Sequence, residues 1–164
     1  MTPVQTAFLQ CQRMVRAADE NRFWASAFAP AAARPHLFAL YAFNHEIAKT
    51  AETVSQPLLG HIRLQWWRDA LDGIYAGQPR QHEVAFALSE TVRIHALPRA
   101  ELDALIDARE SDLDEVPFKD VTALEAYANA TAGGAQRLAL RILGGGATHE
   151  PRSEEHTSEL QSRE

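Results

Sequence analysis

Apolar side chains recur along this chain at intervals of three and four residues, the spacing that places them on one face of an α-helix. No stretch alternates apolar and polar residues with a period of two, so the pattern carries no β-strand signal. The predicted helices are separated by short connections rich in Pro, Gly or Ser. They cover residues 3–18, 35–54, 58–75, 82–96, 98–113 and 122–143. The predicted fold class is all-α, a bundle of helices.

Capping signals predict where two of these helices begin. Thr2 is followed three residues later by Gln5, the spacing of a capping box. Thr122 and Glu125 repeat this spacing before the last helix. On the helix over residues 58–75, the pattern predicts a buried stripe of Leu59, Ile62, Trp66, Ala70 and Ile74. Trp67, about 100° further round that helix, is then predicted to line either a cavity or a partner surface.

The composition is that of one soluble globular domain, with 164 residues, 46% hydrophobic and 23% charged. A formal net charge of -6 leaves no broad basic surface for nucleic acid. The longest nearly apolar stretch, residues 23–43, is interrupted at residues 34–36, so no transmembrane helix is expected. A peripheral membrane contact stays open. The N-terminus lacks the pattern of a secretory signal, and the single Cys11 fits a reducing compartment.

The last residues differ in character from the rest. Residues 152–162 resemble the conceptual translation of a sequencing-adapter oligonucleotide. We therefore divide the chain into a truncated domain over residues 1–151 and an artefactual tail over residues 152–164; a solvated acidic tail is the alternative. On this interpretation the natural protein continues beyond the domain. The helices over residues 58–75 and 122–143 are then expected to expose apolar faces.

Carboxylates cluster in the middle of the chain, at Asp103, Asp107, Glu110, Asp112, Asp114 and Glu115. Asp103 and Asp107 are four residues apart and share a helix face. The same holds for Glu110 and Asp114. Carboxylates on the inner face of a bundle can bind Mg²⁺, which makes Asp107, Glu110 and Asp114 candidate metal ligands. A solvated acidic face is the alternative, and the histidines show no spacing typical of zinc ligands.

Several distinctive segments occur together in this sequence. They are residues 21–31, residues 37–43, Trp67-Arg68-Asp69-Ala70-Leu71, the run from Leu105 to Leu113 with Asp107, Glu110 and Asp112, and Tyr127 with Ala132-Gly133. This set resembles the N-terminal half of the squalene/phytoene synthase family, over roughly residues 10–146. The resemblance implies the N-terminal part of an all-α isoprenoid synthase fold with a central cavity.

The resemblance also implies a chemistry. In the family, two aspartate-rich motifs on facing helices bind Mg²⁺, which holds the diphosphate of a prenyl substrate while two such substrates join head to head. Carboxylates suit this task because Mg²⁺ must bridge anionic ligands to a polyanionic phosphate. By resemblance, the substrate-binding residues are Phe23, Tyr41, His45, Lys49, Trp67, Tyr127 and Gly133.

The first metal motif departs from the family pattern. The pattern Asp-Asp-x-x-Asp is expected at positions 48, 49 and 52, where this chain has Ala48, Lys49 and Glu52. The arginine expected at 45 is His45. Two of the three expected metal ligands are absent, so ionisation of a substrate from this side should be badly impaired. Lys49 can instead neutralise a phosphate directly, or form an ordinary helix ion pair with Glu46 or Glu52. The second motif is expected beyond residue 151.

Residues 42–48 and 57–71 look most like the branch of the family that includes the mitochondrial complex I assembly factor and its bacterial relatives. One hypothesis is an impaired or non-catalytic protein that binds a prenyl diphosphate or another isoprenoid lipid, or assists the assembly of a respiratory complex. A second is a Mg²⁺-dependent prenyl transferase that uses Glu46, Glu52 or the carboxylates of residues 107–114. A third is a protein-binding helical module built around Trp67. The composition suggests a bacterial protein, in the cytoplasm or peripheral to the inner membrane.

Overall fold

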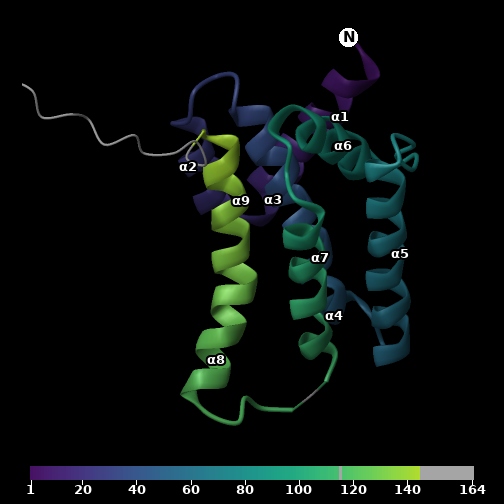
Figure 1. Ribbon diagram of the computed structural model, residues 1–164, viewed down its shortest axis with the longest axis vertical. Helices are drawn as coiled ribbons and strands as arrows, with labels where there is room; N and C mark the ends of the chain where they lie inside the picture. The colour runs from purple at the N-terminus through teal and green to yellow at the C-terminus, as the bar shows by residue number, and fades with distance from the viewer. Residues whose placement is uncertain (115, 145–164) are drawn as a thin grey trace, which may run out of the picture.

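The computed structural model describes residues 1–114 and 116–144, and these residues form helices and no strand (Figure 1). The elements are α1 (Pro3–Ala18), α2 (Glu20–Ala27), α3 (Arg34–Ala48), α4 (Thr50–Thr53), α5 (Pro57–Tyr75), α6 (Glu83–His95), α7 (Arg99–Ala108), the 3-10 helix η1 (Glu110–Leu113), α8 (Val121–Ala128), the π-helical segment η2 (Asn129–Gly133) and α9 (Gly134–Ile142). The all-α prediction is confirmed. No described helix has both the length and the apolar character needed to cross a membrane. The adapter-like tail and the position expected for the second aspartate motif lie outside the described residues.

The first capping prediction is confirmed and the second is wrong. The Thr2 hydroxyl accepts a hydrogen bond from the Gln5 N–H at 3.3 Å, and the Gln5 side chain accepts one from the Thr2 N–H at 2.8 Å. The last helix is capped by Asp120, whose carboxylate accepts from the Ala123 N–H at 2.8 Å. Asp120 has the extended backbone that a capping residue needs, whereas Thr122 already lies inside α8.

Two predicted helices are interrupted, a third, over residues 122–143, contains the π-helical segment η2, and one element was not predicted. The helix expected over residues 35–54 ends at Ala48, and Lys49 links α3 to the short α4. The helix expected over residues 98–113 tightens after Ala108 into η1. The apolar spacing gave no helix at α2, which is capped by a hydrogen bond from the Arg22 N–H to the Asp19 carboxylate at 3.0 Å.

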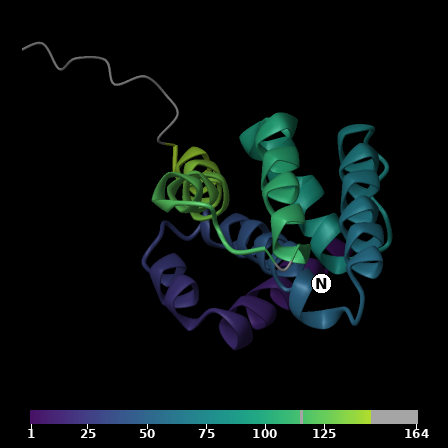
Figure 2. The same cartoon turned by 90° about the horizontal axis from the view of Figure 1, so that it is seen from below.

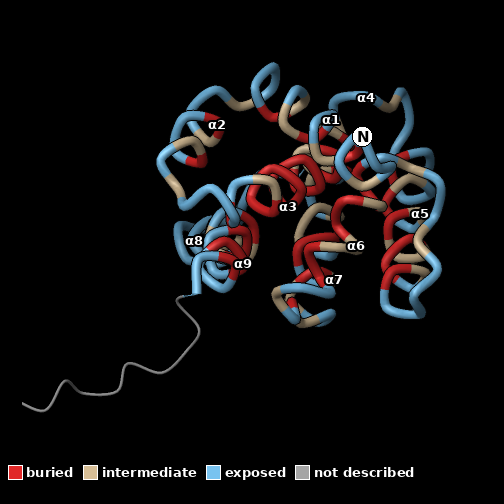
Figure 3. Tube along the Cα trace, turned by 90° about the horizontal axis from the view of Figure 1, so that it is seen from above, coloured by how far each residue is buried: buried red, intermediate tan, exposed pale blue. Residues whose placement is uncertain are grey.

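Helix α3 is the centre of the fold. Every residue from His36 to Asn44 is buried, as are Glu46 and Ile47, because α1, α2, α6 and α9 pack around it (Figure 3). Phe43 on this helix meets the ring of Trp67 edge-on, with 5.3 Å between ring centroids. In its C-terminal half, α3 reaches solvent only at His45, at Ala48 and at Lys49 just after it.

The remaining helices form a row in which α7 lies between α5 and the rod made by α8, η2 and α9 (Figures 1 and 2). Two glycines permit this close packing. A Cβ at Gly60 of α5 would overlap the side chain of Leu113, and one at Gly134 of α9 would lie 2.9 Å from Leu105 Cδ2. The row therefore brings the middle of α5 against the acidic end of α7.

The buried face of α5 differs from the predicted one. Its buried residues are Gly60, Leu64, Trp67, Ala70, Leu71 and Ile74. Trp67 is 1% exposed, so it belongs to the core and lines no partner surface. Trp66 is only partly buried, and the guanidinium of Arg80 lies 5.4 Å from the centroid of its ring. The predicted face, with Trp66, and the observed buried face, with Trp67, are both apolar. Apolar spacing alone does not say which of the two faces meets α3.

Two helix faces carry uncovered apolar side chains, as the sequence predicts. The exposed residues on α5 are Leu58, Leu59 and Ile62; those on and beside α8 and α9 are Val121, Leu124, Leu140 and Leu143. No residue of α8 is buried. Contiguous exposed apolar surface of this kind promotes association.

We expect the isolated 164-residue chain to self-associate or to behave as a molten globule. Replacing Leu59 and Ile62 together by Lys should increase the monomer fraction in analytical ultracentrifugation, because it removes part of the apolar face of α5. Phe28→Ser is the control, since Phe28 is 88% exposed but lies on neither face. A sharp, cooperative thermal transition from a soluble monomer of the unaltered chain would contradict this expectation.

Substitution of the two adjacent tryptophans should separate a core residue from a surface one. Trp67→Ala is expected to lower the free energy of unfolding by about 3–5 kcal/mol, because it removes a fully buried indole. Trp66→Ala should cost less than half of this, since Trp66 is only partly buried. Urea denaturation of the protein expressed from its uninterrupted gene measures both, and equal losses would show that the burial of α5 is misassigned.

Candidate functional site

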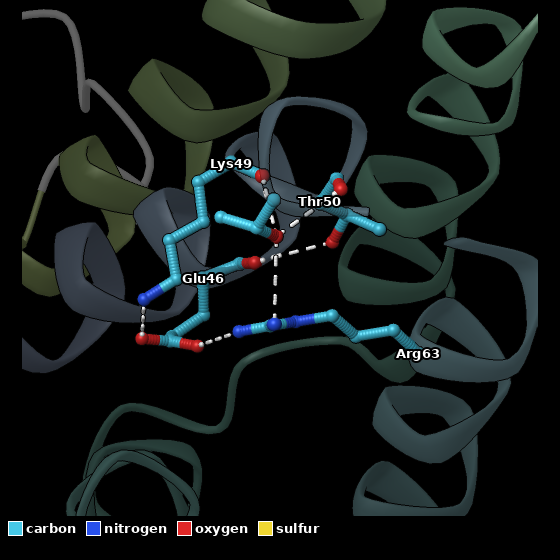
Figure 4. Close-up of polar contacts among 5 residues, drawn as sticks. Glu46, Lys49, Thr50 and Arg63 are labelled. Atoms are coloured by element: carbon cyan, nitrogen blue, oxygen red, sulfur yellow. Dashed lines mark hydrogen bonds and ion pairs between the residues drawn. The ribbon is translucent and has the colours of Figure 1, made fainter. Parts of the chain in front are cut away.

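A buried carboxylate held by two cations occupies the end of α3, where the family pattern places its first metal motif. The Glu46 side chain is 7% exposed. Its Oε1 accepts a hydrogen bond from Lys49 Nζ, one turn further along the chain, and its Oε2 accepts one from Arg63 Nη2 on α5 at 3.1 Å (Figure 4). Arg63 Nη1 also lies 3.5 Å from the hydroxyl oxygen of Thr53. The network ties α3, α4 and α5 together.

The electrostatics of the site follow from this pairing. Burial alone would raise the pKa of Glu46, but the hydrogen bonds and charges of Lys49 and Arg63 outweigh it and hold that pKa below its usual range. Burial, and then the charge of Lys49, lower the pKa of His45. At neutral pH Glu46 is therefore ionised and His45 is neutral, so two cations face a single carboxylate.

The residues at the first motif do not fit a Mg²⁺ site. Ala48 offers no ligand, and the ammonium of Lys49 would repel a divalent cation. Glu46 is occupied by its two cationic partners. Glu52 lies exposed on α4, and within residues 1–114 and 116–144 no ion pair involves it. Of the two interpretations of Lys49, the structure contains the helix ion pair, with Glu46 rather than with Glu52.

The second group of candidate metal ligands is also held by a cation. Arg68 Nη2 donates to Asp107 Oδ1 at 2.7 Å and to Glu110 Oε1 at 2.8 Å. The exposed Asp114 lies beyond the end of η1, outside this pair. Over residues 1–114 and 116–144, no three Asp, Glu, His or Cys side chains gather closely enough to hold a metal ion. The carboxylates are thus brought together, but around an arginine.

Tyr127 belongs to a third polar cluster, between η1 and α8. Its hydroxyl donates to Asp112 Oδ1 at 2.6 Å and accepts from Arg109 Nη1 at 2.8 Å. Burial, followed by the hydrogen bond to Asp112, raises the pKa of Tyr127, so the phenol stays protonated. The next turn is the π-helical segment that ends at Gly133, a local geometry often found at functional sites.

The structure brings only some of the predicted substrate-binding residues together. Tyr41, His45 and Lys49 follow one another at intervals of four residues along α3. Tyr41 also receives the Arg22 guanidinium 5.2 Å from its ring centroid. Phe23 stacks on α3 from α2, with 5.5 Å between its ring centroid and that of Phe38. The other three, Trp67, Tyr127 and Gly133, lie in the core of α5 and on the rod of α8 to α9.

Sequence reasoning missed the arginines that complete these clusters. Arg63 and Arg68 lie 17 and 42 residues from Glu46 and Glu110, their respective carboxylate partners. Arg109 lies 18 residues from Tyr127. All three arginines lie inside segments that carried the resemblance, residues 57–71 and the run from Leu105 to Leu113, but neither segment identified their partners.

Curated relatives of this chain carry two kinds of name. It is 34% identical over 151 residues to "NADH dehydrogenase (ubiquinone) complex I, assembly factor 6" of Bos taurus, which is 92% of this chain and 45% of that protein. The Homo sapiens protein of the same name is 32% identical over the same shares. A presqualene diphosphate synthase of Rhodopseudomonas palustris is 28% identical over 70% of this chain and 41% of that enzyme. The chain thus spans less than half the length of these relatives.

Solved structures confirm the fold. A dehydrosqualene synthase in complex with ligand superposes with a TM-score of 0.76 at 18% identity, covering 86% of this chain and 50% of that one. The squalene synthase HpnC of Alicyclobacillus acidocaldarius gives 0.77 at 26% identity, covering 86% of this chain and 52% of that one. The predicted N-terminal part of an isoprenoid synthase fold is confirmed.

The expectation of a bacterial protein, in the cytoplasm or peripheral to the inner membrane, is wrong. The assembly-factor relatives at 34% and 32% identity are eukaryotic proteins, from cattle and from human. An Ala- and Arg-rich composition was the basis of that expectation, and composition constrains solubility and charge rather than origin.

The match to a protein family covers most of the chain. The family described as squalene/phytoene synthase matches residues 15–161, from the last turn of α1 through every later helix that the structure describes. The match also runs into the segment that resembles translated adapter. This chain belongs to the squalene/phytoene synthase family.

Proposed function

We propose that this protein is a non-catalytic or strongly impaired member of the family, which binds a prenyl diphosphate or another isoprenoid lipid and serves in the assembly of respiratory complex I. The proposal is carried by one observation. At the first metal motif, the acidic side chain nearest the protein interior, Glu46, is paired with Lys49 and Arg63. A carboxylate that already neutralises two cations is a poor ligand for a third.

The acidic cluster on η1 supports the same proposal. Asp107 and Glu110 share Arg68, so neither is free to replace the missing aspartates without breaking an ion pair. Any Mg²⁺ ion that the whole protein uses would therefore need ligands from other parts of it. The assembly role is supported by the names of the relatives, which at 34% and 32% identity are complex I assembly factors.

A working prenyl transferase is the second candidate. It is favoured by the presqualene diphosphate synthase that is 28% identical to this chain. Of the replacement carboxylates, only Glu52 and Asp114 make no ion pair with another of the described residues, and both are exposed. They lie on separate elements, α4 and the end of η1, so a metal site built on either needs further ligands.

The protein expressed from its uninterrupted gene should release little pyrophosphate from farnesyl or geranylgeranyl diphosphate in the presence of Mg²⁺. We expect a turnover at least about 100-fold below that of the presqualene diphosphate synthase relative, because the loss of one charge-stabilising group costs about 100–1,000-fold. A pyrophosphate-coupled assay with both proteins in parallel measures this ratio. Release at the rate of the active enzyme would overturn the proposal.

Restoring the motif provides a matched gain-of-function variant. Ala48→Asp combined with Lys49→Asp returns two carboxylates to the end of α3 and removes one cation from Glu46. This variant should bind Mn²⁺ more tightly than the unaltered protein, as followed by electron paramagnetic resonance. Equal Mn²⁺ affinities would show that the ion network does not decide metal binding here.

The pairing of Glu46 also predicts a pH dependence of stability. Since folding lowers the pKa of Glu46, its contribution to the free energy of unfolding is complete above the usual glutamate pKa of about 4.3 and is lost as the pH falls through the lower pKa of the folded state. Glu46→Gln should lack this part of the acid destabilisation. At neutral pH it should be about 1–3 kcal/mol less stable, because two cations lose their partner.

Urea denaturation at neutral pH and at about pH 3.5, below the usual glutamate pKa, measures both effects. Glu52→Gln is the matched control, since Glu52 is exposed and makes no ion pair. If the stability of Glu46→Gln changes with pH in parallel with the unaltered protein, Glu46 does not contribute in this way.

A further inference from the structure

The end of α3 is a partly solvent-accessible position on an otherwise buried helix. Its neighbours in the chain, from His36 to Asn44, are covered by other helices. Lys49 and Arg63 keep 25% and 37% of their side-chain surface exposed, whereas Glu46 beneath them keeps 7%. The two cations therefore lie between a buried carboxylate and solvent (Figure 4).

Lys49 and Arg63 both contact one and the same carboxylate. Two cations face Glu46, and the neighbouring His45 is neutral because its pKa is lowered. Asp19, on the side of His45, is paired with Arg22 at 3.2 Å. The exposed Glu52 is the other nearby anion, and it makes no ion pair in the part of the chain that the structure describes.

Both cations also have unused hydrogen-bond donors. An ammonium carries three donors and a guanidinium five. Lys49 donates one hydrogen bond to Glu46, while Arg63 donates to Glu46 and, at 3.5 Å, to Thr53. Glu46 shows the geometry that an anion can adopt here, because its two oxygens bridge the two cations, one oxygen to each.

We infer that Lys49 and Arg63 form a metal-independent binding site for the diphosphate group of a ligand, with Glu46 as the internal counter-ion that fixes their spacing. The inference rests on the proposed function, because a site that held its diphosphate through Mg²⁺ would need carboxylates at these positions. A diphosphate is preferred over a single carboxylate because it offers acceptor oxygens on two linked phosphorus centres, and so can reach both cations from the solvent side.

The helix itself makes both cations necessary. The last carbonyls of α3 point toward Lys49, and the C-terminal end of a helix carries partial negative charge. A bare anion would be repelled from this end. Lys49 and Arg63 offset part of this negative charge, as a divalent cation does in a carboxylate-lined site.

The test measures binding of inorganic pyrophosphate in the presence of EDTA, by isothermal titration calorimetry on the protein from its uninterrupted gene. We expect binding without metal, and a loss of affinity of about tenfold or more for Lys49→Gln and for Arg63→Gln, since each removes a charge-assisted hydrogen bond. Glu46→Gln should raise the affinity, because it frees both cations. A residue that only stabilised the fold would not give changes of opposite sign.

Three further variants complete the design. Arg93→Gln removes the cation of another i,i+3 pair, with Glu90 on α6, and should leave the affinity unchanged. Glu52→Gln removes a nearby carboxylate that no cation holds, and should raise the affinity less than Glu46→Gln. Arg63→Lys should keep most of the affinity if Arg63→Gln fails to fold, because it preserves the charge.

Two further binding experiments, each with a different ligand, identify the source of the diphosphate. Farnesyl diphosphate binding more tightly than pyrophosphate indicates a prenyl ester. Binding to anionic phospholipid vesicles that Lys49→Gln abolishes, with no affinity for pyrophosphate, overturns the diphosphate assignment in favour of a lipid headgroup. Binding that requires Mg²⁺, or equal affinities for the unaltered protein, Lys49→Gln and Arg63→Gln, also overturns it. Pyrophosphate release in the turnover assay tests the proposed function separately, since the binding measurement involves no reaction.

Discussion

The need to neutralise a buried carboxylate governs the end of α3. An ionised Glu46 with 7% of its side chain exposed must be compensated by opposite charge, because the cost of removing it from water is several kcal/mol. A divalent cation can supply this opposite charge, and so can the cationic side chains of Lys and Arg. This chain uses the second, with Lys49 one turn away and Arg63 reaching across from α5. The same pairing joins α3 to α5, so the electrostatic solution is also part of the packing.

A second group of carboxylates, at the end of α7, is also paired with a cationic side chain. Asp107 and Glu110 are both about half exposed, so their pairing with Arg68 is screened by solvent and contributes little to stability. The main effect of this pairing is that the carboxylate oxygens are less available to a metal ion. The ion pairs at the end of α7 and at the end of α3 each compete with any metal for the same oxygens.

Apart from the cap at Thr122, the sequence predicted what depends on neighbours along the chain and missed what depends on contacts across it. The Thr2 cap and the Glu46–Lys49 pair lie within one turn, and both were available from spacing. The choice between Trp66 and Trp67 depended on which side of α5 meets α3, which spacing does not contain. Arg63 is likewise set by the packing of α5 against α4. The fold class was therefore predictable, whereas the charge partners that decide the chemistry were not.

This division explains how the fold persists while the chemistry changes. Positions 36–44 and 46–47 of α3 are buried against other helices, so their side chains are constrained by packing. His45, Ala48, Lys49 and Glu52, where the chain departs from the family pattern, are all partly or fully exposed. A substitution there costs little packing energy, and a cation at position 49 gains a carboxylate partner. The backbone can then superpose on squalene synthase with a TM-score of 0.77 at 26% identity, although these exposed positions differ from the pattern expected by resemblance. Changes at these positions therefore require no loss of the structure that surrounds them.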